Sequence, residues 1–185
     1  MDGINKEVGL IKNVLSSTDF DRLCMHFKNH EGLDIAPTDE FGRKLAGDKS
    51  EPILKEFSEL LLPKVREYFG SQTMLPSYSL FAEYSDETIS LHKHKDANAC
   101  TYTLDLVLYQ GDPWALYVDG KPYIAKPNEA ILFMGEDYEH WRETLYNNTG
   151  KIGDVFFHYV EPDHWYFTKG PEYVKEIWAQ RQTQK

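Results

Sequence analysis

The chain has 185 residues, of which 41% are hydrophobic and 27% are charged, and its formal net charge is −10. This length and apolar content suit one globular domain with a filled core. An acidic surface repels phosphate backbones, which disfavours nucleic acid as a partner. Cys24 and Cys100 form neither a disulfide framework nor a CxxC metal motif, which favours reduced thiols and a cytoplasmic location. The sequence also shows no secretory signal and no run of apolar residues long enough to cross a membrane.

The first 76 residues are predicted to be mainly helical, with one short strand near their start. The run EVGLIKNVLS (7–16) favours a strand that ends in a polar turn. The run SSTDFDRLCMHFKNH (16–30) has apolar residues on one helical face and predicts a helix. Thr18 and Asp21 have the spacing of a capping box at its beginning.

A polar stretch and a second helix follow. Residues 32–50 are rich in Asp, Gly and Lys, show little periodicity and are predicted to be mostly loop. Residues 51–70 carry a regular apolar stripe and predict the strongest helix of the chain. Pro52 suits its first turn, Pro63 predicts a kink, and Gly70 predicts its end.

Residues 77–165 are predicted to form seven or eight short strands with no helix between them. The runs are SYSLFAEYS (77–85), ISLHKHKD (89–96), CTYTLDLVLY (100–109), WALYVDGKPYI (114–124), AILFM (130–134), HWRETLY (140–146) and KIGDVFFHYV (151–160). The Asp-Gly pair inside the fourth run predicts a hairpin turn. This pattern favours an antiparallel sandwich or small barrel, and a last helix is expected in 166–185.

Two histidines and an aspartate crowd into the stretch SLHKHKDANA. On a strand, His92, His94 and Asp96 would share one face, with the two intervening lysines on the other. A second histidine from a later strand would complete a set of two imidazoles and one carboxylate. Such a set leaves three metal positions open, as in non-haem Fe(II) oxygenases. His140, which follows the apolar run 130–134, is the candidate for this distal ligand.

The other histidines have simpler interpretations. His92 is expected to line the site beside the ligands, because the H-x-D spacing suits His94 better. His158 lies in an aromatic strand, which indicates a core histidine with a satisfied hydrogen bond, and His164 is expected to be exposed. The predicted metal-binding and catalytic set is therefore His94, Asp96 and His140.

These features resemble the 2-oxoglutarate/Fe(II)-dependent dioxygenases, in particular their prolyl-hydroxylase-like branch, over about residues 78–159. The resemblance rests on Tyr84 before the H-x-D pair, the strand in 101–113 after it, and the hairpin, strand and distal histidine in 116–143. It implies an α+β fold built on a double-stranded β-helix, a jelly roll or cupin-like barrel. The single domain 1–185 would comprise helical support in 1–76, a β-barrel core in 77–165 and a C-terminal helix in 166–185.

The resemblance also implies a hydroxylase that uses Fe(II), 2-oxoglutarate and O2, with ascorbate as a further candidate, and that releases succinate and CO2. The far carboxylate of 2-oxoglutarate needs a cation. In this family a basic residue about ten positions after the distal histidine has that role, and Lys151 fits this place. Arg142, two residues after His140, is the alternative, and Tyr84 and Tyr109 are candidate hydroxyl donors.

Two other functions fit the same sequence. One is a cupin-like metalloprotein that does not use 2-oxoglutarate, and the other is a non-catalytic jelly-roll module that binds a partner. The fold does not select among substrates, and a chain of this modest length with few insertions is compatible with a peptide or a small molecule as the substrate of the oxygenase. Specificity is expected in the loop 34–50 and in the tail after Val160, since loops carry it. The sequence holds no readable signal of oligomeric state.

Overall fold

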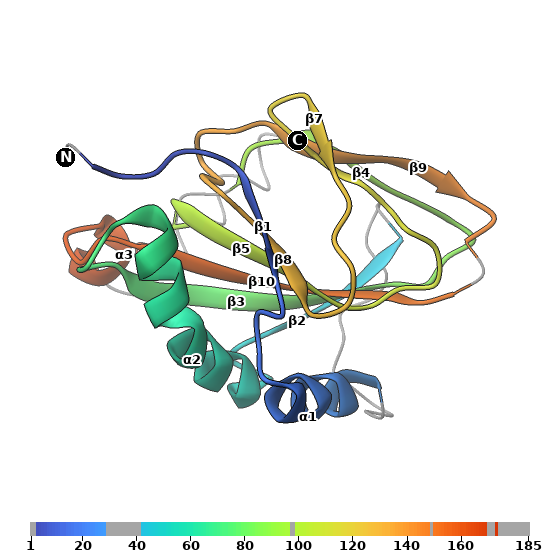
Figure 1. Cartoon of the computed structure of the whole chain (residues 1–185), viewed down its shortest axis with the longest axis horizontal. Coiled ribbons are helices and arrows are strands. Elements are labelled where there is room, and N and C mark those ends of the chain that lie inside the picture. Colours follow the sequence, from blue (N-terminus) through green and yellow to red (C-terminus); the bar gives the residue numbers. More distant parts are fainter. Residues whose placement is uncertain (1–2, 29–41, 97–98, 149, 170–172, 174–185) are drawn as a thin grey trace.

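Two antiparallel β-sheets face each other in the computed structural model, which describes residues 3–28, 42–96, 99–148, 150–169 and 173 (Figure 1). The larger sheet has the strand order β1 (Gly9–Lys12), β8 (Glu129–Phe133), β5 (Tyr102–Tyr109), β10 (Ile152–Val160), β3 (Leu75–Tyr84) and β2 (Arg43–Gly47). The smaller sheet has the order β4 (Thr88–His94), β9 (His140–Tyr146), β6 (Leu116–Val118) and β7 (Lys121–Tyr123). The predicted jelly roll is confirmed.

The helices α1 (Ser17–Lys28) and α2 (Pro52–Phe69) cover the outer face of the larger sheet (Figure 1). The helix α1 is capped by Ser16, which is hydrogen-bonded to Asp19, so the predicted capping pair Thr18 and Asp21 is wrong. The Oγ of Ser16 accepts a hydrogen bond from the Asp19 backbone N–H at 3.1 Å and donates to its carboxylate at 2.6 Å. Within the described part of the chain, no helix has both the length and the apolar character needed to cross a membrane.

The second helix follows the prediction closely. Pro52 lies in its first turn, where the missing N–H costs nothing, and Pro63 lies inside it. Gly70 ends the helix with a φ of 78°, a left-handed conformation in which a side chain would be strained. Its backbone N–H donates to the carbonyl of Arg66 at 2.8 Å.

The N-terminal part contributes strands as well as helices. The prediction of loop in 32–50 is wrong for β2, which pairs antiparallel with β3 and forms one edge of the larger sheet. The predicted strand in 7–16 is confirmed as β1, at the other edge. Residues 34–41 of the predicted specificity loop lie outside the described residues. So does most of the predicted last helix, of which the structure describes α3 (Trp165–Thr168).

The strands of the larger sheet have two different faces. On β5, Leu104 and Leu106 pack toward the helices, while Val107 packs with Leu116 and Val118 of the smaller sheet. Because side chains alternate along a strand, every second residue of β5 and β10 points into the space between the two sheets. We call this side of the larger sheet the inner face. Its buried polar residues on these two strands are Thr103, Asp105, Asp154 and His158.

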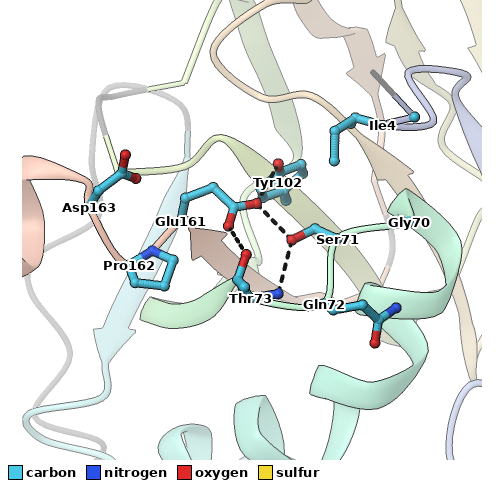
Figure 2. Close-up of a pocket in the computed structure, with 10 residues that line it drawn as sticks. Ile4, Gly70, Ser71, Gln72, Thr73, Tyr102, Glu161, Pro162 and Asp163 are labelled. Carbon is cyan, nitrogen blue, oxygen red and sulfur yellow. Dashed lines mark hydrogen bonds between the residues drawn. The ribbon is translucent and has the colours of Figure 1, made fainter. Parts of the chain in front are cut away.

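A pocket of about 490 Å³ lies where α2 ends, and four of its polar side chains are hydrogen-bonded to one another (Figure 2). The carboxylate of Glu161, just after β10, accepts hydrogen bonds from the hydroxyls of Ser71 at 2.7 Å, Thr73 at 2.6 Å and Tyr102 at 2.9 Å. These bonds fasten the end of β10 to the connection between α2 and β3. We therefore assign this cluster a structural role.

Candidate metal centre

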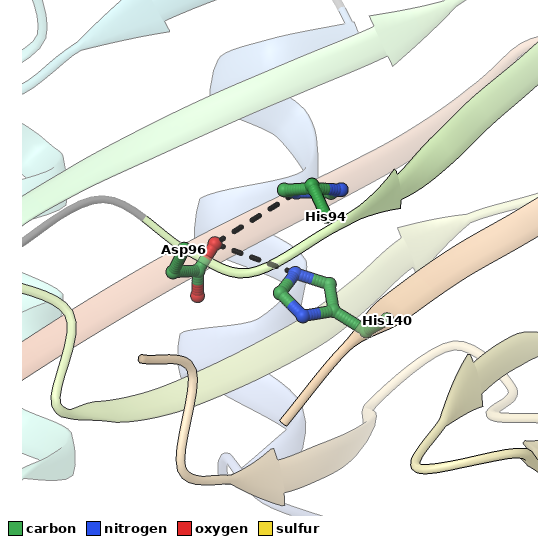
Figure 3. Close-up of side chains that lie close together, drawn as sticks. All are labelled: His94, Asp96 and His140. Atoms are coloured by element: carbon green, nitrogen blue, oxygen red, sulfur yellow. Dashed lines mark ion pairs between the residues drawn. The ribbon is translucent and has the colours of Figure 1, made fainter. Parts of the chain in front are cut away.

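Two neighbouring strands of the smaller sheet bring the predicted ligands together (Figure 3). His94 ends β4 and lies directly opposite His140, the first residue of β9. Asp96 follows two residues later, where its backbone N–H donates to the Gly135 carbonyl at 2.9 Å. The Oδ1 atom of Asp96 lies 3.3 Å from Nε2 of His140 and 4.0 Å from Nε2 of His94. One ligand atom from each of the three residues lies within 4.8 Å of the other two.

A β-bulge in β4 directs His94 toward this site. Between Leu91 and His94, β4 has one residue more than the partner strand β9. Simple alternation from the buried Leu91 would turn Lys93 inward, whereas the bulge turns His94 inward instead. The expectation that His92 adjoins the ligands is confirmed, because its ring centroid lies 5.2 Å from that of His94, but its side chain is exposed. Its backbone carbonyl nevertheless accepts a hydrogen bond from Nδ1 of His94 at 2.8 Å.

Hydrogen bonds to the backbone fix both imidazoles in the form that a metal requires. Since a carbonyl can only accept, Nδ1 of His94 donates to His92, and Nδ1 of His140 donates to the Tyr138 carbonyl at 3.1 Å. The Nε2 atom of each ring is then the one available as a ligand. Such outer hydrogen bonds orient metal-binding histidines and raise their basicity.

The carboxylate of Asp96 is oriented in the same way. Its Oδ2 accepts a hydrogen bond from the Thr103 hydroxyl at 2.9 Å, which leaves Oδ1 facing the histidines. A Cβ atom at Gly135 would lie 2.2 Å from this Oδ2 and 2.5 Å from the Thr103 hydroxyl oxygen. The close approach of Asp96 to the backbone therefore requires glycine at position 135.

We expect Gly135→Ala to lower the affinity for Fe(II) by about 10-fold to 100-fold, the usual cost of disturbing the groups that orient a metal ligand. The added methyl group must displace Asp96 or Thr103. Anaerobic titration with Fe(II) measures this affinity. Gly47→Ala is the matched control, because a Cβ there meets ordinary contacts with Leu80 at 3.5 Å and with the Ser79 carbonyl oxygen at 3.9 Å. Equal affinities in the two folded variants would contradict the role of Gly135.

The charges in the centre favour a bound cation. Burial raises the pKa of Asp96, but the hydrogen bond and charge of His140 outweigh burial and hold that pKa below its usual range. Burial and the charge of His140 lower the pKa of His94 to about 4. Burial lowers the pKa of His140, but the hydrogen bond and charge of Asp96, together with the Tyr138 carbonyl and Asp105, raise it above its usual value. An ion bound by the three groups would replace the proton that His140 shares with Asp96.

Two further side chains adjoin Asp96. One ligand atom each of Asp96, Cys100 and His158 also lie within 4.8 Å of one another. The buried His158 faces the Tyr78 carbonyl through Nδ1 at 3.2 Å, and burial lowers its pKa. The prediction of a core histidine with a satisfied hydrogen bond is therefore confirmed for His158, although its position beside the metal centre was not expected. His164 instead caps α3, where its Nδ1 accepts from the Tyr166 N–H.

Arg142 lies on the inner side of β9, two residues after His140, and is buried between two carboxylates. Its Nη2 donates to Asp105 at 3.1 Å and to Asp154 at 2.9 Å. Its Nη1 donates to the carbonyl of Trp114 at 2.7 Å, and its guanidinium carbon lies 5.0 Å from the centre of the Trp114 ring. We call Arg142, Asp105 and Asp154 the charge cluster.

Burial dominates the electrostatics of the charge cluster. It raises the pKa of Asp105, and it raises that of Asp154 to about 7, although the charge of Arg142 opposes both shifts. Four buried polar atoms in the described part of the chain have no hydrogen-bond partner, and all lie here: Oδ1 of Asp105, Oδ1 of Asp154, Nε of Arg142 and the hydroxyl of Tyr84. Sequence reasoning missed both aspartates. Their signal is an acidic residue in the interior of an otherwise apolar strand.

Lys151 and Tyr109 lie on the other side of the larger sheet. The Lys151 ammonium pairs with Glu83 at 3.0 Å, and 65% of its side chain is exposed. The Tyr109 hydroxyl donates to the same carboxylate at 2.9 Å. Glu83 shares its face of β3 with Phe81, which packs in the core beneath the helices. The structure thus brings Arg142 and Tyr84 together on the inner face and places Lys151 and Tyr109 away from it.

No family model and no curated protein match the sequence. Solved structures match the fold at low identity. HygX from Streptomyces hygroscopicus, with nickel and 2-oxoglutarate bound, has a TM-score of 0.66 at 12% identity over 88% of this chain and 85% of that chain. EctD from S. alaskensis, with bound Fe, has a TM-score of 0.68 at 11% identity over 88% of this chain and 79% of that chain. A prolyl-4-hydroxylase from Pseudomonas putida has a TM-score of 0.63 at 12% identity over 85% of this chain and 94% of that chain.

The chain therefore has the jelly-roll fold that these Fe(II) and 2-oxoglutarate oxygenases share, as the sequence resemblance predicts. The prolyl-hydroxylase-like branch is not singled out, because HygX and EctD match with TM-scores at least as high.

Proposed function

We propose that the protein is an Fe(II)- and 2-oxoglutarate-dependent oxygenase that hydroxylates a small molecule or peptide and releases succinate and CO2. The observation that carries this proposal is the convergence of His94, Asp96 and His140 between the sheets of this fold. HygX is also known with hygromycin B bound, and EctD with 2-oxoglutarate and 5-hydroxyectoine, which supports a small-molecule substrate here.

The three ligands suit Fe(II) by number, type and orientation. Two imidazoles with Nε2 available and one carboxylate oxygen match the two-histidine, one-carboxylate set and leave positions for other ligands. Bound Fe(II), together with 2-oxoglutarate and dioxygen, would supply the oxidising chemistry. The side chains of His94, Asp96 and His140 hold the ion, and Thr103 keeps the carboxylate oriented.

We assign the far carboxylate of 2-oxoglutarate to Arg142 rather than to Lys151. Arg142 is buried on the inner side of β9, two residues after His140, whereas Lys151 is largely exposed and paired with Glu83. Nε of Arg142 is a buried N–H group without a partner, and the buried Tyr84 hydroxyl, which has the charges of Arg43 and Arg142 nearby, is a second group that can donate to a carboxylate.

The proposed function predicts a visible charge-transfer band when Fe(II) and 2-oxoglutarate are added together without oxygen, and succinate formation when oxygen is admitted. Absorption spectroscopy of the full chain and quantification of succinate test both results. Stoichiometric metal without 2-oxoglutarate binding would favour a cupin-like metalloprotein. No stoichiometric metal, and a melting temperature unaffected by chelators, would favour a non-catalytic binding module.

A further inference from the structure

The charge cluster holds more negative charge than one arginine can balance. Asp105 and Asp154 are 2% and 0% exposed, and the single guanidinium of Arg142 donates to both. With both carboxylates ionised, the three side chains carry a net charge of about −1, and each carboxylate has an unpartnered oxygen. A buried carboxylate without a full set of partners is costly, so the cluster favours retention of a proton.

A bound 2-oxoglutarate makes this imbalance larger. Its far carboxylate would bring a third negative charge to the same guanidinium. Carboxylates that lie close together in a buried site cannot all stay ionised, and one of them takes a proton. A carboxylic acid that is kept neutral in this way becomes a hydrogen-bond donor to an anion.

The surroundings of the two aspartates distinguish between them. Asp105 interacts electrostatically with His140 and Asp96 of the metal centre, where bound Fe(II) would add positive charge, whereas Asp154 has Arg142 as its counter-charge and Asp105 as a repelling neighbour. The titratable and charged groups that act on Asp154 from the inner face are Arg142 from β9, Asp105 from β5 and Tyr84 from β3, and Tyr109 of β5 acts on it from the other side of the sheet. The proton is therefore most stable on Asp154.

We propose that Asp154 is a co-substrate-binding residue in its acid form, which donates a hydrogen bond to the far carboxylate of 2-oxoglutarate beside Arg142. This proposal rests on the proposed function. Above the pKa of Asp154 in the free protein, one proton enters the site with each 2-oxoglutarate and forms the O–H bond of the acid, and no other covalent bond is made or broken in the step. The site consequently binds a carboxylate although two aspartates already surround its arginine.

The proposal fixes the direction of the pH dependence. Binding raises the pKa of Asp154 above its value in the free protein, which is about 7. The affinity for 2-oxoglutarate is therefore fully present below that pH and falls as the pH rises, by up to about tenfold per pH unit.

Calorimetry of the Fe(II)-loaded full chain, without oxygen, tests this between pH 6.5 and 9. Titration of 2-oxoglutarate in two buffers of different ionisation enthalpy gives the number of protons taken up. We expect about one proton at pH 8 and a dissociation constant that rises with pH. Asp154→Asn retains an N–H donor without a titrating group, so its affinity should depend little on pH and its proton uptake should be lost.

Asp112→Asn is the matched control, because Asp112 is exposed and lies in the loop after β5. It should keep the proton uptake of the wild type. Wild-type binding without proton uptake would overturn this proposal alone, and this measurement needs no variant to fold. Proton uptake that persists in Asp154→Asn but is lost in Asp105→Asn would move the role to Asp105. Absence of 2-oxoglutarate binding at every pH would overturn the proposed function and this proposal together.

Discussion

His94→Ala is expected to abolish stoichiometric Fe(II) binding and with it the formation of succinate. Removal of one of the three ligand groups should lower the affinity for Fe(II) by more than about 100-fold, since about 100-fold is the upper cost of disturbing a hydrogen bond that only orients a ligand. Metal analysis after gel filtration and the anaerobic charge-transfer band measure the loss. The fold should remain, because the His94 side chain belongs to none of the buried apolar clusters of the described residues.

His92→Ala is the matched control for this prediction. The two histidines lie on the same strand and their rings are neighbours, but the His92 side chain is exposed, and the hydrogen bond that His92 gives the centre comes from its backbone carbonyl, which alanine retains. The control should keep both metal and activity. A His94→Ala protein that still binds one Fe(II) tightly would show that another group completes the site, and His158 would be the first to examine.

Arg142→Met is expected to destabilise the protein by about 3–5 kcal/mol, because it leaves two buried carboxylates without their counter-charge. Urea-induced unfolding measures this loss. Lys6→Met is the control, since its ammonium group and the Asp137 carboxylate with which it pairs are both exposed and such ion pairs contribute about 0–1 kcal/mol. Similar losses in the two variants would contradict the central place of Arg142 in the fold.

A combined variant separates the stabilising role of Arg142 from its proposed role in binding. When Asp105→Asn and Asp154→Asn are added to Arg142→Met, no uncompensated charge remains in the cluster, and much of the lost stability should return. The proposed anchor is still absent, so 2-oxoglutarate affinity should stay low by calorimetry. Recovered affinity in this folded variant would assign the far carboxylate to another cation.

The strands of the barrel and the metal set are largely predictable from the sequence. Runs of β-branched and aromatic residues alternate with turn residues, and the pair Asp119 and Gly120, with φ values of 48° and 77°, forms the hairpin that its sequence indicates. The H-x-D pair and the later His140 also lie where strand order would place them. Local patterns suffice for these features because each depends on few neighbouring residues.

Side-chain direction is harder to predict, because it depends on where each strand begins and on its irregularities. Lys151 has the chain spacing of an anchor, but it precedes β10 and turns toward Glu83, while Asp154 takes the inward position three residues later. The strand β2 is hidden in a polar stretch for a related reason. Its strand conformation comes from pairing with β3 and not from a pattern of its own.

The bulge in β4 divides that strand into two parts in which different alternate residues point inward. Before the bulge, the inward-pointing side chains are those of Ile89 and Leu91, which lie in the apolar core. After the bulge they are those of His94 and Asp96, which lie in the metal centre. These two sets are offset by one residue, so a regular strand without the bulge could point either set inward but not both. Substitutions of Ile89 or Leu91 should therefore alter the packing of the core, and substitutions of His94 or Asp96 should alter metal binding. Each group should have little effect on the property that the other controls.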